Sequence, residues 1–96
     1  MSRITVYFPD ATCSLGWDTF KIGKVRVSGW WGDIIHHDNP EGLPTAEFPS
    51  TYPSHLYPDI ETLVEDFRDA GYHIPLRAIN AAADARDRST EQEFTA

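Results

Sequence analysis

The first 38 residues contain short runs in which hydrophobic positions are arranged as in β-strands. Residues 3–8 (RITVYF) are rich in β-branched and aromatic side chains and stop at a Pro-Asp turn signal. Residues 20–22 form a short additional strand in this interpretation. The segment between them, residues 11–18, carries a cysteine, a glycine and a tryptophan, and we expect a loop there.

A second alternating run covers residues 24–31 (KVRVSGWW) and also predicts a strand. Gly32 and Asp33 follow it and precede a further strand-like run at residues 34–37. Two residues of this kind between two such runs are a signal for a tight β-hairpin. We therefore expect the chain to turn at Gly32 and Asp33.

Residues 39–58 hold five of the seven prolines, which disfavours both a helix and an interior strand. Large apolar side chains nevertheless recur through this segment, and a flexible linker would not carry so many. We expect an ordered, extended strap that packs across the sheet or against a helix. A segment of this kind is either a cover for the core or a functional element.

A helix is predicted over residues 59–70, because apolar residues recur there with helical spacing. The stripe consists of Ile60, Leu63, Val64, Phe67 and Ala70. Asp59 suits the N-cap, and Gly71 suits the left-handed residue after the helix end. A second helix is predicted from Pro75 to about Arg88. Its weaker apolar face consists of Leu76, Ile79, Ala82 and Ala83.

The fold class that follows is α+β: a small antiparallel sheet of three or four strands, the proline-rich strap, and two C-terminal helices packed on one face. Residues 1–88 form one domain in this interpretation. The last eight residues, 89–96, are predicted to be a frayed or disordered tail.

The balance of charges narrows the functions that this chain can serve. Its formal net charge is −7, and its eight lysines and arginines are scattered. Direct nucleic-acid binding is not expected, because such proteins present a basic patch to the phosphates. An acidic protein suits a basic partner, although acidity also serves solubility alone.

Cys13 is the only cysteine, so no internal disulfide can form, which favours a reducing compartment such as the cytoplasm. No stretch reaches the length of a signal peptide's apolar region or of a membrane span, and no membrane partner is expected.

The exposed side of the first predicted helix is strongly acidic. Its carboxylates are Glu61, Glu65 and Asp69, which form a row at i, i+4 and i+8, with Asp66 beside the row. Like charges at this spacing destabilise a helix by roughly 0.2–0.5 kcal/mol per pair, so folding alone does not explain them. The row is either a docking face for a basic surface or an ordinary solvated face, which Lys24 or Arg26 of the sheet could neutralise.

Trp30 and Trp31 are neighbours on one predicted strand, so their side chains face opposite sides of the sheet. One of them must therefore meet the strap or face solvent. Tryptophan is enriched at binding hot spots, which makes both residues candidates for partner binding.

The sequence contains little that indicates a catalytic function. The four histidines lack a zinc-binding spacing, Cys13 lies in no known nucleophile motif, and no phosphate-binding glycine loop is present. We expect no catalytic residue, no metal site and no cofactor. A metal- or thiol-dependent enzyme that uses Cys13 or the histidines is the weakest alternative.

The function expected from the sequence is therefore binding of another protein. A specific form is an inhibitor of the phage type that occupies a basic, nucleic-acid-binding surface of its target, as a nucleic-acid mimic. The alternative is a small adaptor, antitoxin or assembly component that acts by self-association, so that a homo-oligomer is also conceivable. Its self-association surface would be formed by Trp30 and Trp31.

Overall fold

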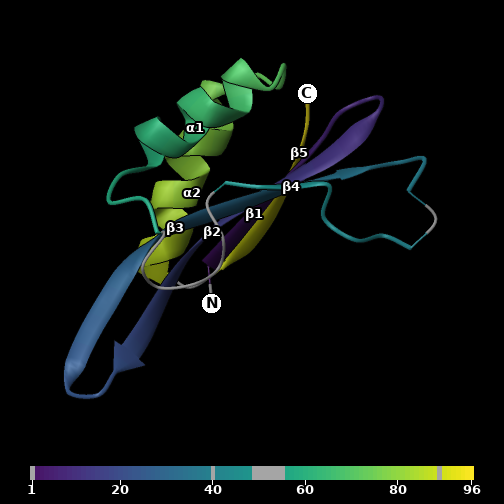
Figure 1. The fold of residues 1–96 in the computed structure, drawn as a ribbon. Coiled ribbons are helices and arrows are strands. Elements are labelled where there is room, and N and C mark those ends of the chain that lie inside the picture. The colour runs from purple at the N-terminus through teal and green to yellow at the C-terminus, as the bar shows by residue number, and fades with distance from the viewer. Residues whose placement is uncertain (1, 40, 49–55, 89) are drawn as a thin grey trace.

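The computed structural model describes residues 2–39, 41–48, 56–88 and 90–96. They form one five-stranded sheet and two helices, an α+β arrangement (Figure 1). The elements are β1 (Ser2–Tyr7), β2 (Ala11–Ile22), β3 (Val25–His36), β4 (Ala46–Glu47), α1 (Ile60–Asp69), α2 (Leu76–Arg88) and β5 (Glu91–Thr95).

The strand order in the sheet is β4-β3-β2-β1-β5. All neighbouring pairs are antiparallel except β1 and β5, which run parallel. The α+β class is confirmed, whereas the expected antiparallel sheet of three or four strands is wrong: the sheet is mixed and has five strands. Among the described residues, no helix is both long enough and apolar enough to span a membrane.

Strand β2 corrects the expectation of a loop at residues 11–18. The chain is extended from Ala11 to Ile22 and pairs with β1 on one side and β3 on the other. Ala11, Cys13 and Leu15 are fully buried under the helices. The sequence pattern concealed this strand because its buried positions are occupied largely by small residues.

Strand β3 corrects the predicted hairpin at Gly32 and Asp33. It continues without interruption through both residues, which pair with Leu15 and Ser14 of β2. The turn between β2 and β3 instead contains Gly23, whose backbone has a φ of 60°, the left-handed region that glycine tolerates best.

Gly32 serves close packing rather than a turn. A Cβ atom built on Gly32 would lie 2.8 Å from Cζ of Phe67 and 2.9 Å from its Cε2. These distances are shorter than real Cβ contacts, so any side chain at this position would push α1 away from the sheet.

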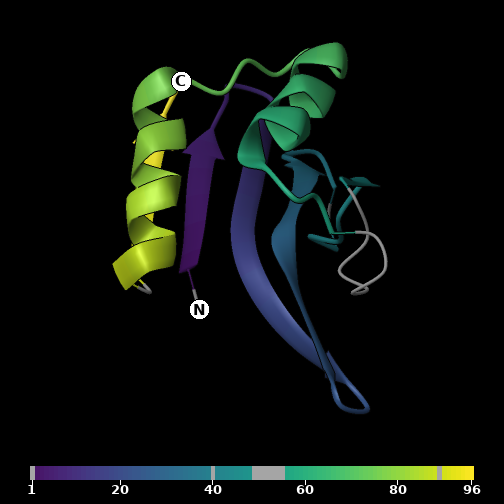
Figure 2. The same ribbon diagram turned by 90° about the vertical axis from the view of Figure 1, so that its left-hand side faces the viewer.

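Both helices cover the same face of the sheet, with α1 over β3 and α2 over β1 (Figure 2). Helix α1 confirms its sequence prediction: the Asp59 side chain caps it, and Gly71 follows it with a φ of 98°. Its stripe of Ile60, Leu63, Val64 and Phe67 is buried, as expected, whereas Ala70 is exposed.

Helix α2 is also confirmed, but with a different buried face. Ala78, Ala82 and Ala85 are buried, whereas Leu76, which was expected in the core, is 69% exposed. Residues with small side chains let the helix approach β1 closely, so the larger side chains were a misleading guide to its inner face.

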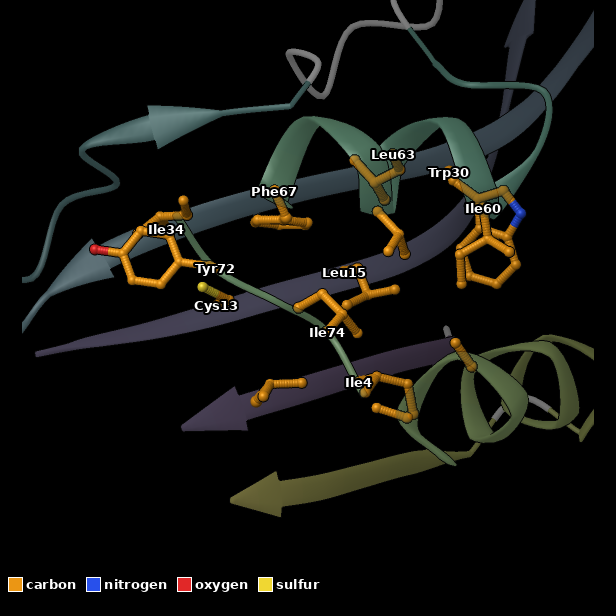
Figure 3. Close-up of a cluster of buried hydrophobic side chains, with 14 of the residues drawn as sticks. Ile4, Cys13, Leu15, Trp30, Ile34, Ile60, Leu63, Phe67, Tyr72 and Ile74 are labelled. Atoms are coloured by element: carbon orange, nitrogen blue, oxygen red, sulfur yellow. The ribbon is translucent and has the colours of Figure 1, made fainter. Parts of the chain in front are cut away.

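The core lies between the two helices and the covered face of the sheet (Figure 3). Ile4 and Leu15 contribute from the central strands, and Trp30 and Phe67 are its largest fully buried side chains. One contiguous apolar cluster thus joins β1, β2 and β3 to both helices.

Strand β5 corrects the expectation of a frayed tail. Residues 91–95 pair in parallel with β1, and Phe94 packs against the core cluster. Glu91 and Glu93 are exposed on this edge strand. The segment therefore has the polar composition of a disordered tail, although it pairs with β1 as a strand.

The described parts of the proline-rich segment do not confirm a strap across the sheet or a helix. They extend the sheet at its edge: β4 pairs with β3, and Tyr57 exchanges two backbone hydrogen bonds with Trp30, at 2.8 and 3.0 Å. The remainder of the expected strap, residues 40 and 49–55, lies outside the described residues.

We expect Gly32→Ala to lower the free energy of unfolding by about 1–3 kcal/mol, because its methyl group would overlap the Phe67 ring. In a Phe67→Leu background, which removes the ring atoms nearest Gly32, most of this cost should disappear. Gly23→Ala is the control. A Cβ atom built on Gly23 meets no atom within 4 Å, so the cost of this substitution should come from the positive φ of the backbone and should not depend on Phe67. Chemical denaturation measures all four proteins, and an equal cost of Gly32→Ala in both backgrounds would contradict the packing role.

Phe94→Ala should lower the free energy of unfolding by about 1–2 kcal/mol, because the ring covers the core from β5. The exposed neighbour Thr95 provides the control, and Thr95→Ala should change stability by less than about 0.5 kcal/mol. Equal, negligible effects of both substitutions would mean that the C-terminal residues do not form a strand in solution.

Candidate functional site

The acidic row of α1, Glu61, Glu65 and Asp69, is exposed along its whole length. Asp66 beside the row is half-buried. These carboxylates lie opposite the buried stripe that holds α1 on the sheet. The four acidic residues predicted as binding residues are therefore brought together on one surface.

No carboxylate of the acidic row forms an ion pair with another described residue. The salt bridge found among the described residues lies in α2 and joins Arg86 to Asp87, with 3.4 Å between Nε and Oδ1. The idea that Lys24 or Arg26 of the sheet neutralises the row is wrong for this structure, because Lys24 lies in the turn between β2 and β3 and Arg26 lies next to that turn. Figure 1 shows this end of the hairpin far from α1. Arg68, three residues after Glu65 on the same helix, is the one basic residue in the last turn of α1 and can offset only part of the charge of the row.

Helix α1 is a firm support for these carboxylates. Oδ1 of Asp59 accepts hydrogen bonds from the backbone amide of Thr62 at 2.9 Å and from its hydroxyl group at 2.6 Å. These two bonds lower the pKa of Asp59, so the cap is charged at neutral pH. With Ile60 and Phe67 buried at either end, the helix presents its outer side in one orientation.

Trp30 is a core residue and not a surface anchor. It is 2% exposed, and its ring meets Trp17 edge-on at 5.3 Å between centroids. The Arg86 guanidinium lies 5.2 Å from the Trp17 ring centroid and 5.8 Å from that of Trp30, which places a cation over both rings.

Trp31 lies on the second face of the sheet, the one away from the helices, and is 8% exposed. Its ring covers Gly16 of β2, where a Cβ atom would lie 2.7 Å from Cζ2 of the indole. Neither Trp30 nor Trp31 faces solvent, so the structure does not place them on a surface with the acidic row.

A groove that the sequence reasoning missed crosses the second face of the sheet over β5, β1 and β2. Its volume is about 600 Å³, and its lining consists of Arg3, Thr5, Tyr7, Thr12, Glu91, Gln92 and Glu93. The alternation of polar residues in β1 indicated part of it, but the contribution of β5 depends on a strand that was not predicted.

Charged groups sit close together along this groove. The Tyr7 hydroxyl donates to Oε1 of Glu93 at 3.2 Å, and the negative charge of Glu93 raises the pKa of Tyr7. The Arg3 guanidinium donates to Oγ of Ser14 at 3.2 Å. Beside them, burial raises the pKa of Asp33, an effect that the nearby positive charge of Arg3 partly offsets.

Cys13 lies in the core rather than in a site. It is fully buried, and burial raises the pKa of its thiol to about 12. The thiol is therefore protonated at neutral pH and is not a nucleophile in the folded protein.

The three described histidines are dispersed. Nε2 of His37 lies 3.0 Å from Oγ1 of Thr12, His36 packs edge-on against Tyr72, and His73 is exposed. His55 lies outside the described residues. Within the described ranges, no group of three metal-binding side chains comes together.

Cys13 should react with a thiol-alkylating reagent only as fast as the protein unfolds, and denaturant should make the reaction rapid. Because the folded pKa of about 12 exceeds the ordinary value of 9.0, the thiol contributes stability that is fully present below pH 9 and is lost as pH rises toward 12. Cys13→Ala should lack that part of the alkaline loss when unfolding is measured over this range. Rapid labelling of the native protein would contradict the buried position.

Comparison of the chain with protein-family models, curated proteins and solved structures finds no match. The candidate site is thus defined by the geometry of its own residues: a firmly anchored helix with an exposed row of carboxylates that forms no ion pair with a described residue.

Proposed function

We propose that this chain is a non-enzymatic protein-binding domain whose acidic row on α1 docks against a basic surface of a partner protein. The observation that carries the proposal is the exposed row of Glu61, Glu65 and Asp69, which has no ion pair with any described residue. We further propose a reducing, cytoplasmic location, because the single cysteine excludes an internal disulfide.

Energetics support a binding role for the row. Two like-charge pairs at i, i+4 oppose helix formation, and Asp69 adds a negative charge at the helix end that prefers a cation. A basic partner surface would reverse the sign of these interactions. The row therefore costs the isolated domain a little stability and contributes favourable energy only when a cationic surface meets it.

The spacing of the row suggests which partner surface fits. Successive carboxylates four residues apart on a helix are separated by roughly 6 Å along the axis, so the row spans roughly 12 Å. A linear array of negative charges of this kind matches a groove lined with lysine and arginine, such as a protein uses to hold a nucleic-acid backbone. In its specific form, the proposal is therefore an inhibitor that occupies a nucleic-acid-binding surface of its target.

The alternative of an adaptor that self-associates through Trp30 and Trp31 has less support. Both side chains are buried within the folded chain, so neither contributes an accessible apolar surface. The acidic row is the predicted surface that remains available to a partner.

The triple variant Glu61→Lys, Glu65→Lys, Asp69→Lys should lose its partner in affinity purification from the native host's lysate, whereas the wild-type protein retains it. The Kd for the purified partner should rise by at least about tenfold, which corresponds to a loss of about 1.4 kcal/mol of electrostatic attraction. Added nucleic acid should compete with the wild-type protein for the same site on the partner.

The matched control reverses three exposed carboxylates elsewhere, Asp38→Lys, Glu41→Lys and Asp84→Lys, and thus changes the net charge equally. This variant should keep the partner. A second control, Glu65→Lys alone, replaces two like-charge pairs by two opposite-charge pairs, makes one new like-charge pair with Arg68, and should raise stability by about 0.5 kcal/mol. Partner binding that survives the triple reversal, or is lost equally in the charge-matched control, would rule out the acidic row as the docking face.

A further inference from the structure

The β2–β3 hairpin extends beyond the body of the protein as an arm, which consists of residues 19–28. Strand β1 pairs with β2 only as far as Trp17, and the bridge from Tyr57 reaches β3 only at Trp30. Beyond these points the two strands pair with no other described residue than each other, and Figure 2 shows the hairpin projecting away from both helices. A two-stranded hairpin without a covering layer is marginally stable in water.

One side of the arm is apolar. Phe20 pairs across the strands with Val27, and Ile22 pairs with Val25, so these four side chains continue the second face of the sheet. Ile22 is 56% exposed and Val25 is 63% exposed. Apolar side chains gathered in this way on a projecting element mark a surface that another molecule covers.

The other side of the arm is basic. Lys21 lies directly opposite Arg26, a like-charge pair that weakens the hairpin, and Lys24 lies in the turn. The arm holds three of the chain's eight basic residues and none of its acidic ones, which gives the arm a charge of +3 and leaves −10 on the rest of the chain. These three basic residues thus lie on an element that carries no acidic residue to offset them.

We propose that the arm is a dimerisation element, which packs its apolar side against the same side of the arm of a second copy. Such an isologous pair lets the four apolar residues of each copy cover the four of the other. The charges select the arrangement in which the two arms run in opposite directions. Parallel arms would bring six positive charges together, whereas antiparallel arms direct each basic tip toward the acidic body of the other copy.

One ion pair between the copies follows from this arrangement. Asp18 stands at the base of the arm, on the same side as the apolar residues, and Lys24 stands at its tip. When the arms overlap fully in opposite directions, Lys24 of each copy meets Asp18 of the other. Within one arm the two residues are about six strand positions apart, roughly 20 Å, which exceeds the Debye length of about 8 Å at physiological salt. Any coupling between them therefore acts between copies.

Other occupants of the arm fit the charges less well. A nucleic acid or an anionic membrane would attract the three basic residues but would be repelled by the −10 carried by the rest of the chain. A second copy of the chain offers both the matching apolar side and the acidic body.

Sedimentation velocity of the full chain at micromolar concentration tests the proposal, with a dimer of twice 10.9 kDa as the expected species. Ile22→Asp should weaken dimerisation by more than about tenfold, because it puts a charge in the apolar contact. Thr19→Asp is the matched control: it adds the same charge on the other side of the arm and should leave the dimer intact. Circular dichroism verifies that each variant is folded.

The charge swap tests the antiparallel arrangement. Lys24→Asp and Asp18→Lys should each weaken the dimer, and the double variant should restore it. A monomeric wild-type protein, a dimer that persists in Ile22→Asp, or a monomer that binds anionic vesicles or duplex DNA through the arm would overturn the proposal. The triple reversal on α1 should stay dimeric, so failure of partner binding and failure of dimerisation are separate results.

Discussion

The contact between Phe67 and Gly32 is the constraint on which the arrangement of α1 depends. A ring can lie this close to a strand only where the strand lacks a side chain, and β3 supplies such a position at Gly32. Once the ring is in place, the buried stripe of α1 closes over Leu15 and Trp30. The orientation of the acidic row then follows, because Glu65 and its neighbours must occupy the opposite side of the helix.

The elements that could be predicted from the sequence are those whose local pattern agrees with their tertiary surroundings. The helix at residues 59–70 has a strong apolar stripe and a capping aspartate, and the structure buries that stripe. Gly32 shows where local reasoning fails, since a glycine that a turn requires and a glycine that a packed ring requires are identical in sequence. The prediction for strand β5 fails for a related reason. A polar segment can form an edge strand when a single apolar side chain, here Phe94, packs against the core.

The candidate site divides in the same way. Exposure of Glu61, Glu65 and Asp69 could be predicted, because it is the geometric complement of the buried stripe. The opposite orientation of Trp30 and Trp31 could also be predicted, but the burial of both could not, since it depends on which groups cover each face of the sheet. The groove and the arm were also beyond sequence reasoning, because the groove depends on β5 and the arm depends on where the pairing of β1 with β2 stops, at Ser2 and Trp17.

The two proposed interactions reinforce each other through geometry. The arm and α1 lie toward opposite ends of the molecule in both views (Figures 1 and 2), so a partner on the acidic row would not compete with a second copy on the arm. A dimer joined through the arms would carry two acidic rows. A target that is itself oligomeric or has repeated basic surfaces would then be bound at two points, which strengthens attachment without any new contact. Under both proposals, the separation of charge along this chain, with +3 on the arm and −10 elsewhere, would serve self-recognition at one end and leave the other end free for a basic target.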